Sequence, residues 1–310
     1  RRQRQMCIRD RCMVAGTNDW RQNHAAYNRG EMDKWAMANT PYSMGYVHEA
    51  DIPVQYKLAE TFTVGDMYYE SIMSSTAPNR VSWFSGTINP PKGSKVNGTN
   101  KHMGGPTLDN RDSVGCERTD SGKPFSCVPL RWKTVPEYLQ EAGISWRVYQ
   151  DKDNFGDDPL VMWKQYQTSA KKKGDLAQRG TSFPGLQKFF DDARDGKLPE
   201  VSYIVAPMQL SEHPPYMPMD GAWIQGEVAK AVMHGKNWDS TALIYSYDET
   251  GGWADHVVSP YPPQSEESEW IEDPYDKSNG ITPIGPGFRL PFYIVSPWTS
   301  GGHVLSLIHI

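Results

Sequence analysis

The 310-residue chain lacks long hydrophobic runs and has little cysteine, and its acidic side chains outnumber its basic ones. No apolar stretch approaches the roughly 20 residues that a membrane-spanning helix needs, so the sequence predicts no transmembrane segment. The net charge of −5 at pH 7 provides no basic stripe for phosphate backbones and argues against a nucleic-acid-binding protein. A phosphate loop of the GxxxxGK type is absent, and so are internal repeats and low-complexity tracts.

Four cysteines are present, and two of them, Cys116 and Cys127, lie in a stretch rich in Gly, Ser and Asp. A disulfide that closes this short loop is predicted, and it would indicate an oxidising compartment. The alternative is a pair of free thiols in a cytosolic protein.

The two ends of the chain differ in character from the rest. Residues 1–12 and 304–310 resemble translated sequencing-adaptor sequence, so we set them aside as artefacts and expect the true protein to continue beyond both. No signal peptide is visible, and with such ends its absence says little. The remaining segment, residues 13–303, is predicted to form a single, incomplete domain.

Strand-like and helix-like segments alternate along the chain. This alternation predicts an α/β fold with a mainly parallel sheet that is covered on both faces. The predicted strands are residues 62–65, 144–149, 201–205, 241–247 and 290–296. The predicted helices are residues 51–60, 67–74, a segment after Pro78, 134–142, 184–195 and 222–234.

Two adjacent carboxylates, Asp248 and Glu249, follow the apolar strand 241–247. Charges at the end of an apolar strand must be hydrated or matched by a cation, and ligands of open α/β sheets bind at the carboxyl ends of strands. Hard oxygen donors at such a place suggest a divalent metal ion. The alternative is a pair of surface charges or a helix cap.

The segment Thr76-Ala77-Pro78-Asn79-Arg80 offers a hydroxyl just before a proline that can open a helix. Backbone N–H groups at a helix start point toward an anion, so this hydroxyl would lie beside an anion cradle. His213 follows strand 201–205 and would meet residues 248–249 at one edge of a parallel sheet. Metal, hydroxyl and anion cradle together describe a phosphoester-cleaving site. A plain N-cap at position 76 and a structural loop histidine at position 213 are the alternatives.

Several motifs occur in an order that is typical of one family. They are Asn23-His24-Ala25-Ala26-Tyr27-Asn28, Ala50-Asp51-Ile52-Pro53, Phe62-Thr63-Val64-Gly65-Asp66, Thr76-Ala77-Pro78-Asn79-Arg80, Ser211-Glu212-His213-Pro214-Pro215, Tyr247-Asp248-Glu249 with Asp255-His256-Val257, and Arg289-Leu290-Pro291. Over roughly residues 18–303 the chain resembles the secreted phosphoesterases that include non-haemolytic phospholipases C and respiratory-burst-inhibiting acid phosphatases. This resemblance implies an alkaline-phosphatase-like, three-layer α/β/α fold and a phospholipase C-like catalytic domain.

The resemblance also implies roles for individual residues. Thr76 would be the nucleophile, and Asp248, Glu249 and Thr76 would hold a divalent metal ion. His24 and His213 would contact the phosphoryl oxygens or shuttle protons. The residues implied for substrate binding are Asn79, Arg80, Asp255 and His256.

The implied activity is metal-dependent hydrolysis of phospholipid phosphodiester bonds through a phosphothreonine intermediate, in a secreted or periplasmic enzyme. Its substrate would be a phospholipid or another phosphoester, with transient contact to a membrane surface and no nucleic-acid partner. The alternatives are an acid phosphatase that acts on phosphomonoesters and a non-catalytic lipid- or surface-binding protein of the same fold.

Two segments of the family pattern are absent from the chain. The family pattern begins with a segment of the Glu-Asn-Arg-Ser-Phe-Asp-His type, which supplies two further metal ligands and a core strand, and ends with one of the Asp-His-Thr-Ser type. The chain as written is therefore expected to be an interior fragment, truncated at both ends, with an incomplete metal site and no activity.

Overall fold

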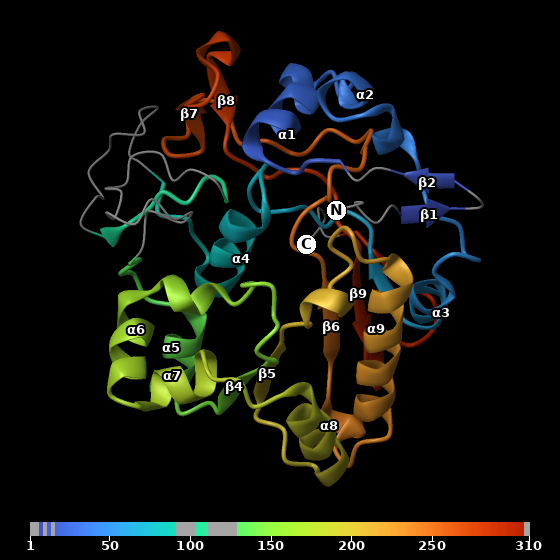
Figure 1. Ribbon diagram of the computed structural model, residues 1–310, viewed down its shortest axis with the longest axis vertical. Coiled ribbons are helices and arrows are strands. Elements are labelled where there is room, and N and C mark those ends of the chain that lie inside the picture. The colour runs from blue at the N-terminus through green and yellow to red at the C-terminus, as the bar shows by residue number, and fades with distance from the viewer. Residues whose placement is uncertain (1–5, 9–10, 14–15, 91–102, 111–128, 307–310) are drawn as a thin grey trace.

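The computed structural model describes residues 6–8, 11–13, 16–90, 103–110 and 129–306 (Figure 1). Its α-helices are α1 (Trp20–Tyr27), α2 (Trp35–Ala38), α3 (Pro53–Thr61), α4 (Thr76–Ser85), α5 (Val135–Glu141), α6 (Lys164–Lys171), α7 (Asp175–Gly180), α8 (Leu186–Asp195) and α9 (Pro218–Met233). Its strands are β1 (Met6–Ile8), β2 (Arg11–Met13), β3 (Thr63–Gly65), β4 (Trp146–Tyr149), β5 (Val201–Ile204), β6 (Leu243–Ser246), β7 (Trp270–Glu272), β8 (Ile281–Pro283), β9 (Phe292–Val295) and β10 (Val304–Leu305). None of the helices in this part of the chain combines the length and apolar character that crossing a bilayer requires. Cys116 and Cys127 lie outside the described residues, so their disulfide stays a prediction.

The β-structure beside the site consists of a four-stranded sheet, in the order β10-β3-β9-β6, and a separate parallel pair, β4–β5. Strand β10 is parallel to β3, whereas β9 is antiparallel to both β3 and β6. The α/β class is as predicted, but the mainly parallel pairing is not found in the four-stranded sheet. The connection from β6 to β9, residues 247–291, contains the hairpin β7–β8 and no α-helix that could serve as the usual crossover between parallel strands.

Both faces of the β4–β5 pair are covered, as the sequence predicted. Trp146 and Val148 of β4 belong to a core cluster that includes residues of α4 and α6, whereas Tyr149 packs with α8 and α9. Successive side chains of a strand point to opposite faces, so this division places helices on both sides of the pair. Figure 1 shows α8 and α9 near β6, and α5, α6 and α7 grouped beside β4.

Local sequence signals predicted several elements correctly. Thr134 and Glu137 form the expected capping box at the start of α5, with the Thr134 N–H donating to Glu137 Oε2 at 2.9 Å. Gly196 ends α8 with φ of 72°, a left-handed conformation that glycine adopts without steric cost. Helix α4 begins at Thr76, two residues before the predicted start.

The predicted helix over residues 67–74 is wrong. This segment is extended and turning, because its backbone groups bond to distant partners. Glu70 N donates to Phe288 O at 2.9 Å and Met73 N donates to Ile284 O at 2.9 Å. The long-range pairing outweighs the local helical pattern, and it brings the segment to the start of α4.

Residues at both ends of the chain take part in regular structure. Strands β1 and β2 form an antiparallel pair in which Met6 lies opposite Met13. Strand β10 begins at Val304, the first of the C-terminal residues that were set aside, and Val304 pairs with Val64 of β3. Whether these segments are foreign to the protein stays a prediction.

Candidate active site

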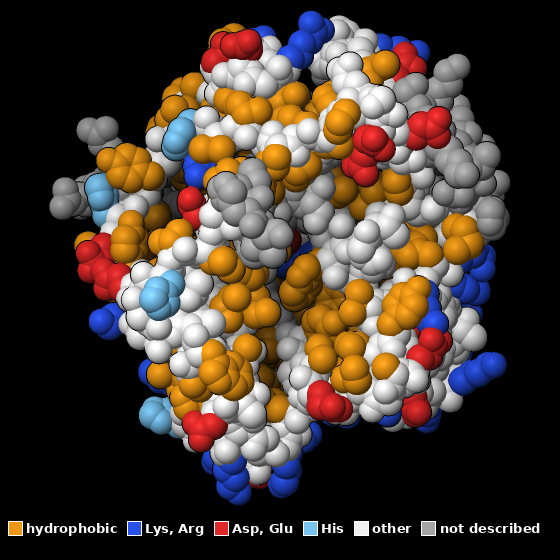
Figure 2. Space-filling model, turned by 180° about the vertical axis from the view of Figure 1, so that it is seen from behind, with side chains coloured by type: hydrophobic (Ala, Val, Ile, Leu, Met, Phe, Trp, Pro, Cys, Tyr) orange, Lys and Arg blue, Asp and Glu red, His pale blue; other side chains and the backbone are white. Residues whose placement is uncertain are grey.

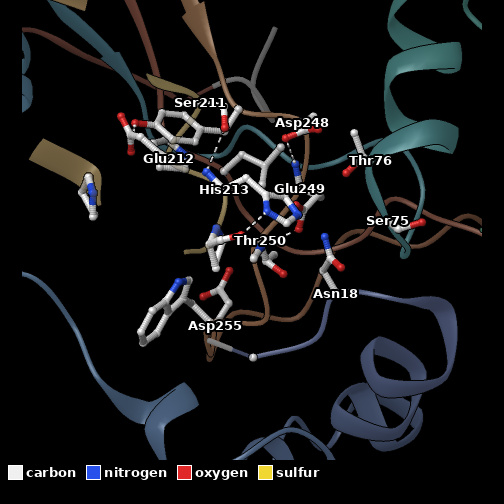
Figure 3. Close-up of a pocket in the computed structure, with 18 of the residues that line it drawn as sticks. Asn18, Ser75, Thr76, Ser211, Glu212, His213, Asp248, Glu249, Thr250 and Asp255 are labelled. Carbon is white, nitrogen blue, oxygen red and sulfur yellow. Dashed lines mark hydrogen bonds between the residues drawn. The ribbon is translucent and has the colours of Figure 1, made fainter. Parts of the chain in front are cut away.

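A pocket of about 810 Å³ lies where β5 and β6 end. It is lined from several elements far apart in the sequence. Figure 3 shows Ser75 and Thr76 on one side, Glu212 and His213 on the other, and Asp248 and Glu249 between them. The structure thus brings together the three clusters that the sequence singled out: the start of α4, the loop after β5 and the acidic pair after β6.

The start of α4 is held by hydrogen bonds with the Asn110 backbone and side chain and with the side chain of Asn79. Asn110 N donates to Ser75 Oγ at 2.8 Å, and Ala77 N donates to Asn110 Oδ1 at 2.7 Å. Asn79, one turn into the helix, is buried and does not line the pocket. Its side chain accepts from Ile72 N and donates to the carbonyl oxygens of residues 72, 74 and 75. Asn79 therefore fixes the segment that leads to Thr76, which differs from the substrate contact that the resemblance implied.

Arg80 is a cationic partner of Asp248 and of a second carboxylate, Asp157. Arg80 Nε donates to Asp248 Oδ2 at 2.9 Å, and Arg80 Nη2 forms an ion pair with Asp157 Oδ2 at 3.0 Å. Arg80 lies four residues after Thr76 on α4, so the two side chains share a face of the helix. The Thr76 side chain therefore points toward the side of the pocket where Arg80 binds Asp248.

Glu249 lies beside Asp248 and is half-buried. Burial and the negative charge of Asp248 raise the pKa of Glu249 to about 8, although the Gly251 N–H and the Asn18 side chain bond to its carboxylate. Burial likewise raises the pKa of the nearby Glu70 well above its usual range, and the charges of Glu249 and Asp248 raise it further. Three carboxylates thus crowd one region, where a cation would stabilise their ionised forms.

The donor set fits a divalent cation only in part. Asp248, Glu249 and Thr76 supply hard oxygen atoms of the kind that Mg²⁺ or Ca²⁺ prefers. Within the described ranges, however, no group of three or more His, Cys, Asp or Glu side chains has the arrangement of a metal site. These residues could hold one side of a cation, and its other ligands would come from water, substrate or groups elsewhere.

His213 lines the pocket and is held in one orientation. Its Nδ1 lies 2.7 Å from Pro214 O, so Nδ1 carries the proton in the neutral ring and Nε2 keeps its lone pair. The ring packs against Phe155, with ring centroids 4.5 Å apart. This geometry suits a group that accepts or returns a proton through Nε2.

Glu212, directly before His213, joins the loop to a polar network under the pocket. Tyr247 Oη donates to Glu212 Oε2 at 2.8 Å, and Gln225 Nε2 donates to Glu212 Oε1 at 2.8 Å. Glu212 also has φ of 64°, a left-handed backbone that non-glycine residues rarely adopt. Burial raises the pKa of Glu212 to about 7, and the bonds from Tyr247, Gln55 and Gln225 oppose this rise. The network therefore holds the histidine-bearing loop in a strained conformation.

We expect Glu212 to make stability fall as the pH rises from about 4.5 to 7. The folded-state pKa exceeds the ordinary value of 4.5, so the unfolded chain releases this proton first and ionisation favours unfolding. Glu212→Gln removes the titration, and the wild type should lose about 3 kcal/mol relative to the variant across this window. Urea unfolding of both proteins at pH 4.5, 6 and 8 measures the difference. If the stability difference between wild type and Glu212→Gln does not change over this pH range, the raised pKa of Glu212 is contradicted.

Four of the seven residues implied as catalytic or substrate-binding line the pocket, and three do not. The four are Thr76, Arg80, His213 and Asp255. Asp255 is held by Arg289, whose Nη2 donates to Asp255 Oδ1 at 2.7 Å. The side chain of His256 is 90% exposed and points to solvent, and Asn79 is the buried residue described above.

His24 is the third residue that the structure does not bring to the pocket. It is buried, its two ring nitrogens lie 2.9 Å from Trp20 O and from Pro283 O, and its ring stacks on Trp20 at 3.9 Å. Burial lowers the pKa of His24, although the two carbonyl groups raise it. These contacts tie α1 to β8 and place His24 outside the pocket, so the phosphoryl contact that the resemblance implied stays a prediction.

Replacement of His24 should therefore weaken the fold more than the chemistry. His24→Ala removes the ring N–H that can donate to one of the two carbonyl oxygens and opens a cavity beside Trp20, so we expect the free energy of unfolding to fall by about 2–4 kcal/mol. Denaturant unfolding measures this loss. A variant of unchanged stability that has lost turnover would instead restore His24 to the chemical step.

Sequence reasoning missed Asn18, Asp157 and Arg289, which also line the pocket. Asn18 bonds to Glu249 and Asp157 pairs with Arg80. Asn18 and Asp157 lie outside every motif, so no spacing signal could have identified them. Arg289 belongs to one of the quoted motifs, but its carboxylate partners Asp255 and Asp66 become visible only in three dimensions.

Comparison with known proteins identifies the family. The family model described as "Phosphoesterase family" matches residues 2–309 of the chain. The chain belongs to the phosphoesterase family. The match runs into both terminal segments and spans the whole pocket, and it agrees with the resemblance that the motifs gave.

Relatives within the phosphoesterase family carry phospholipase names. The chain is 38% identical to "Non-hemolytic phospholipase C" of Pseudomonas aeruginosa, over 95% of this chain and 42% of that protein. It is 34% identical to "Non-hemolytic phospholipase C" of Burkholderia pseudomallei, over 93% of this chain and 42% of that protein. The chain therefore spans less than half the length of these two relatives.

Among solved structures, a protein in the alkaline phosphatase superfamily from Vibrio parahaemolyticus matches 83% of this chain and 56% of its own chain. The sequence identity is 12% and the TM-score is 0.41, which is too low to establish a shared fold. The family assignment rests on the sequence match.

Proposed function

We propose that the chain is the catalytic part of a metal-dependent phosphodiesterase of the phospholipase C type. The observation that carries the proposal is the pocket in which a helix-start hydroxyl, Thr76, faces the half-buried acidic pair Asp248 and Glu249. The phospholipase names of the relatives supply the substrate class. The products would be diacylglycerol and a phosphorylated head group.

In the proposed reaction His213 Nε2 accepts the hydroxyl proton of Thr76 as Thr76 Oγ attacks phosphorus, and the bond from phosphorus to the diacylglycerol oxygen breaks. His213 Nε2 would transfer the proton that the leaving oxygen needs, and the N-terminus of α4 would stabilise the negative phosphoryl oxygens. Water then attacks the phosphothreonine, which breaks its Thr76 Oγ–P bond and restores the hydroxyl. A divalent cation held by Asp248, Glu249 and Thr76 would lower the pKa of the hydroxyl and neutralise charge.

The surroundings of the pocket fit a lipid substrate. Tyr46 lines the pocket and is 71% exposed, and Met44, two residues earlier, is 60% exposed. Aromatic and thioether side chains at the rim of a site favour contact with a membrane interface. We therefore propose transient binding to a lipid surface by an enzyme that works outside the cytoplasm.

Two chromogenic substrates test the proposed function. The 310-residue chain and a version extended with the flanking segments of the Pseudomonas relative should be assayed with p-nitrophenylphosphorylcholine and with p-nitrophenyl phosphate, with and without added Mn²⁺, Ca²⁺ or Zn²⁺. The proposal requires metal-dependent hydrolysis of the diester by the extended chain. Preference for the monoester would indicate a phosphatase, and turnover of neither would indicate a binding protein.

A further inference from the structure

Asn110 and the start of helix α4 are joined by two hydrogen bonds. Asn110 N donates to Ser75 Oγ at 2.8 Å, and Ala77 N donates to Asn110 Oδ1 at 2.7 Å. Because an N–H group must face an oxygen atom, the second bond fixes which way the side-chain amide points. Its Nδ2 group lies on the other side of the amide and forms no hydrogen bond within the described residues. Asn110 therefore keeps two unused N–H donors beside the helix start.

Helix α4 begins with few N–H groups of its own for a ligand. The first N–H groups of a helix have no partner within the helix and can bind an anion. In α4, however, the Ala77 N–H is occupied by Asn110 Oδ1, and Pro78 has no N–H. An amide that accepts from the positive end of a helix is polarised by it, so its own N–H groups become stronger donors. The Asn110 amide thus replaces the occupied helix N–H with two outward-facing ones.

Asn110 lies where two cavities meet. It lines the pocket of about 810 Å³ and a second cavity of about 130 Å³, and Thr76, Arg80 and His213 also line both. The C=O and C–N bonds of an amide, about 1.23 and 1.33 Å long, place Nδ2 within about 5 Å of Ala77 N. Ala77 directly follows Thr76 in α4. A phosphoryl group attacked by Thr76 Oγ would therefore lie within reach of the Asn110 amide.

Few cations are available to bind a phosphoryl group in the pocket. On the face shown in Figure 2, Lys and Arg side chains lie mainly at the margins, and hydrophobic side chains surround the central hollow. Of the described residues that line the pocket, only Arg80 and Arg289 are permanently cationic, and both pair with carboxylates. Neutral N–H donors are therefore needed for phosphoryl oxygens that these cations do not bind.

We propose that Asn110 Nδ2 donates to a non-bridging oxygen of the phosphoryl group bound beside Thr76, which makes Asn110 a further catalytic residue. This inference rests on the proposed function for its reaction. The donor is fixed before substrate binds, because the neighbouring buried carboxylate of Asp109 accepts from Trp20 N at 2.8 Å and from Ser75 Oγ at 3.3 Å. A donor fixed in this way stabilises a transition state without having to reorganise.

Two variants separate this donor role from a structural one. Asn110→Asp keeps an oxygen that can accept from Ala77 N but has no N–H to donate, whereas Asn110→Ala has neither group. We expect both to lower kcat for p-nitrophenylphosphorylcholine at least ~100-fold with little change in KM, because such a donor acts mainly in the transition state. Only Asn110→Ala should lower the melting temperature, since it also leaves the Ala77 N–H without this partner.

Three results with these variants would overturn the proposal. A nearly normal kcat in both would show that the amide takes no part in the reaction. A loss only in Asn110→Ala would show that the residue merely supports the helix start. A loss only in Asn110→Asp would show repulsion by the added carboxylate, because alanine carries no charge.

A measurement without turnover distinguishes failure of this inference from failure of the proposed function. The chain is labelled with ¹⁵N-asparagine and titrated with inorganic phosphate, and the side-chain NH₂ signal of Asn110 is identified by its absence from Asn110→Asp. We expect this signal to shift, whereas that of Asn79, which is buried and already bonded to backbone carbonyls, should not. A shift in a chain that hydrolyses neither chromogenic substrate would support the Asn110 donor and count against the proposed function. If the Asn110 signal does not shift, the proposal is wrong.

Discussion

Thr76→Ala should reduce phosphodiester turnover by at least about 1,000-fold and leave the fold intact, because it removes the proposed nucleophile. Thr76 is the first residue of α4, and the bonds that hold this helix start come from Ser75, Asn110 and Asn79. Its methyl and hydroxyl groups are therefore not needed for local structure. The measurement is kcat/KM with p-nitrophenylphosphorylcholine in the form of the chain that shows turnover.

Three companion variants make this result specific. Thr76→Ser keeps the hydroxyl and should retain part of the activity, whereas Thr76→Val keeps the shape without the hydroxyl and should be as inactive as the alanine variant. Thr250→Ala, at another threonine of the same pocket, should stay within about tenfold of wild type. If Thr76→Ala kept more than a tenth of the wild-type turnover, Thr76 would not be the nucleophile.

Arg80→Met should lower the free energy of unfolding by about 3–5 kcal/mol, because it leaves two carboxylates without their cation. The Arg80 side chain is 25% exposed and pairs with Asp157 and Asp248, whose side chains are 10% and 24% exposed. Methionine preserves the apolar contacts of the arginine stem. Urea unfolding near neutral pH measures the loss.

A second arginine serves as the matched control. Arg194 also pairs with carboxylates on a helix, but its side chain is 66% exposed, so Arg194→Met should lower the stability far less than Arg80→Met does. Adding Asp157→Asn to Arg80→Met should recover part of the loss, since one unpaired charge is then removed. Equal losses in the two single variants would show that the Arg80 pairs stabilise no more than a surface ion pair does.

The sequence predicted those parts of the fold that depend on neighbouring residues. The capping box at Thr134 and the glycine at position 196 defined helix ends, because caps act within one turn. The antiparallel direction of β9 could not be predicted from neighbouring residues, because it depends on how the 45-residue connection between β6 and β9 packs. The same limit applies to residues 67–74, whose backbone partners are about 200 residues away.

The candidate site shows a similar division. Residues whose chemistry is visible in a short motif, such as Thr76, His213 and the acidic pair, do meet in one pocket. His24 and Asn79 lie in equally recognisable motifs but support the backbone around the site. A motif records which residues occur together, and it cannot separate those that face the pocket from those that hold it in place.

The Asn79 side chain has a consequence for which residues position 79 tolerates. Its amide accepts one backbone N–H and donates to three backbone carbonyls, all in the segment just before Thr76. Aspartate has the same shape, but it would turn a carboxylate toward those carbonyls, and glutamine would push the amide too far by one methylene. The position of the Thr76 hydroxyl is thus set in part three residues downstream of it, by a buried side chain that does not line the pocket.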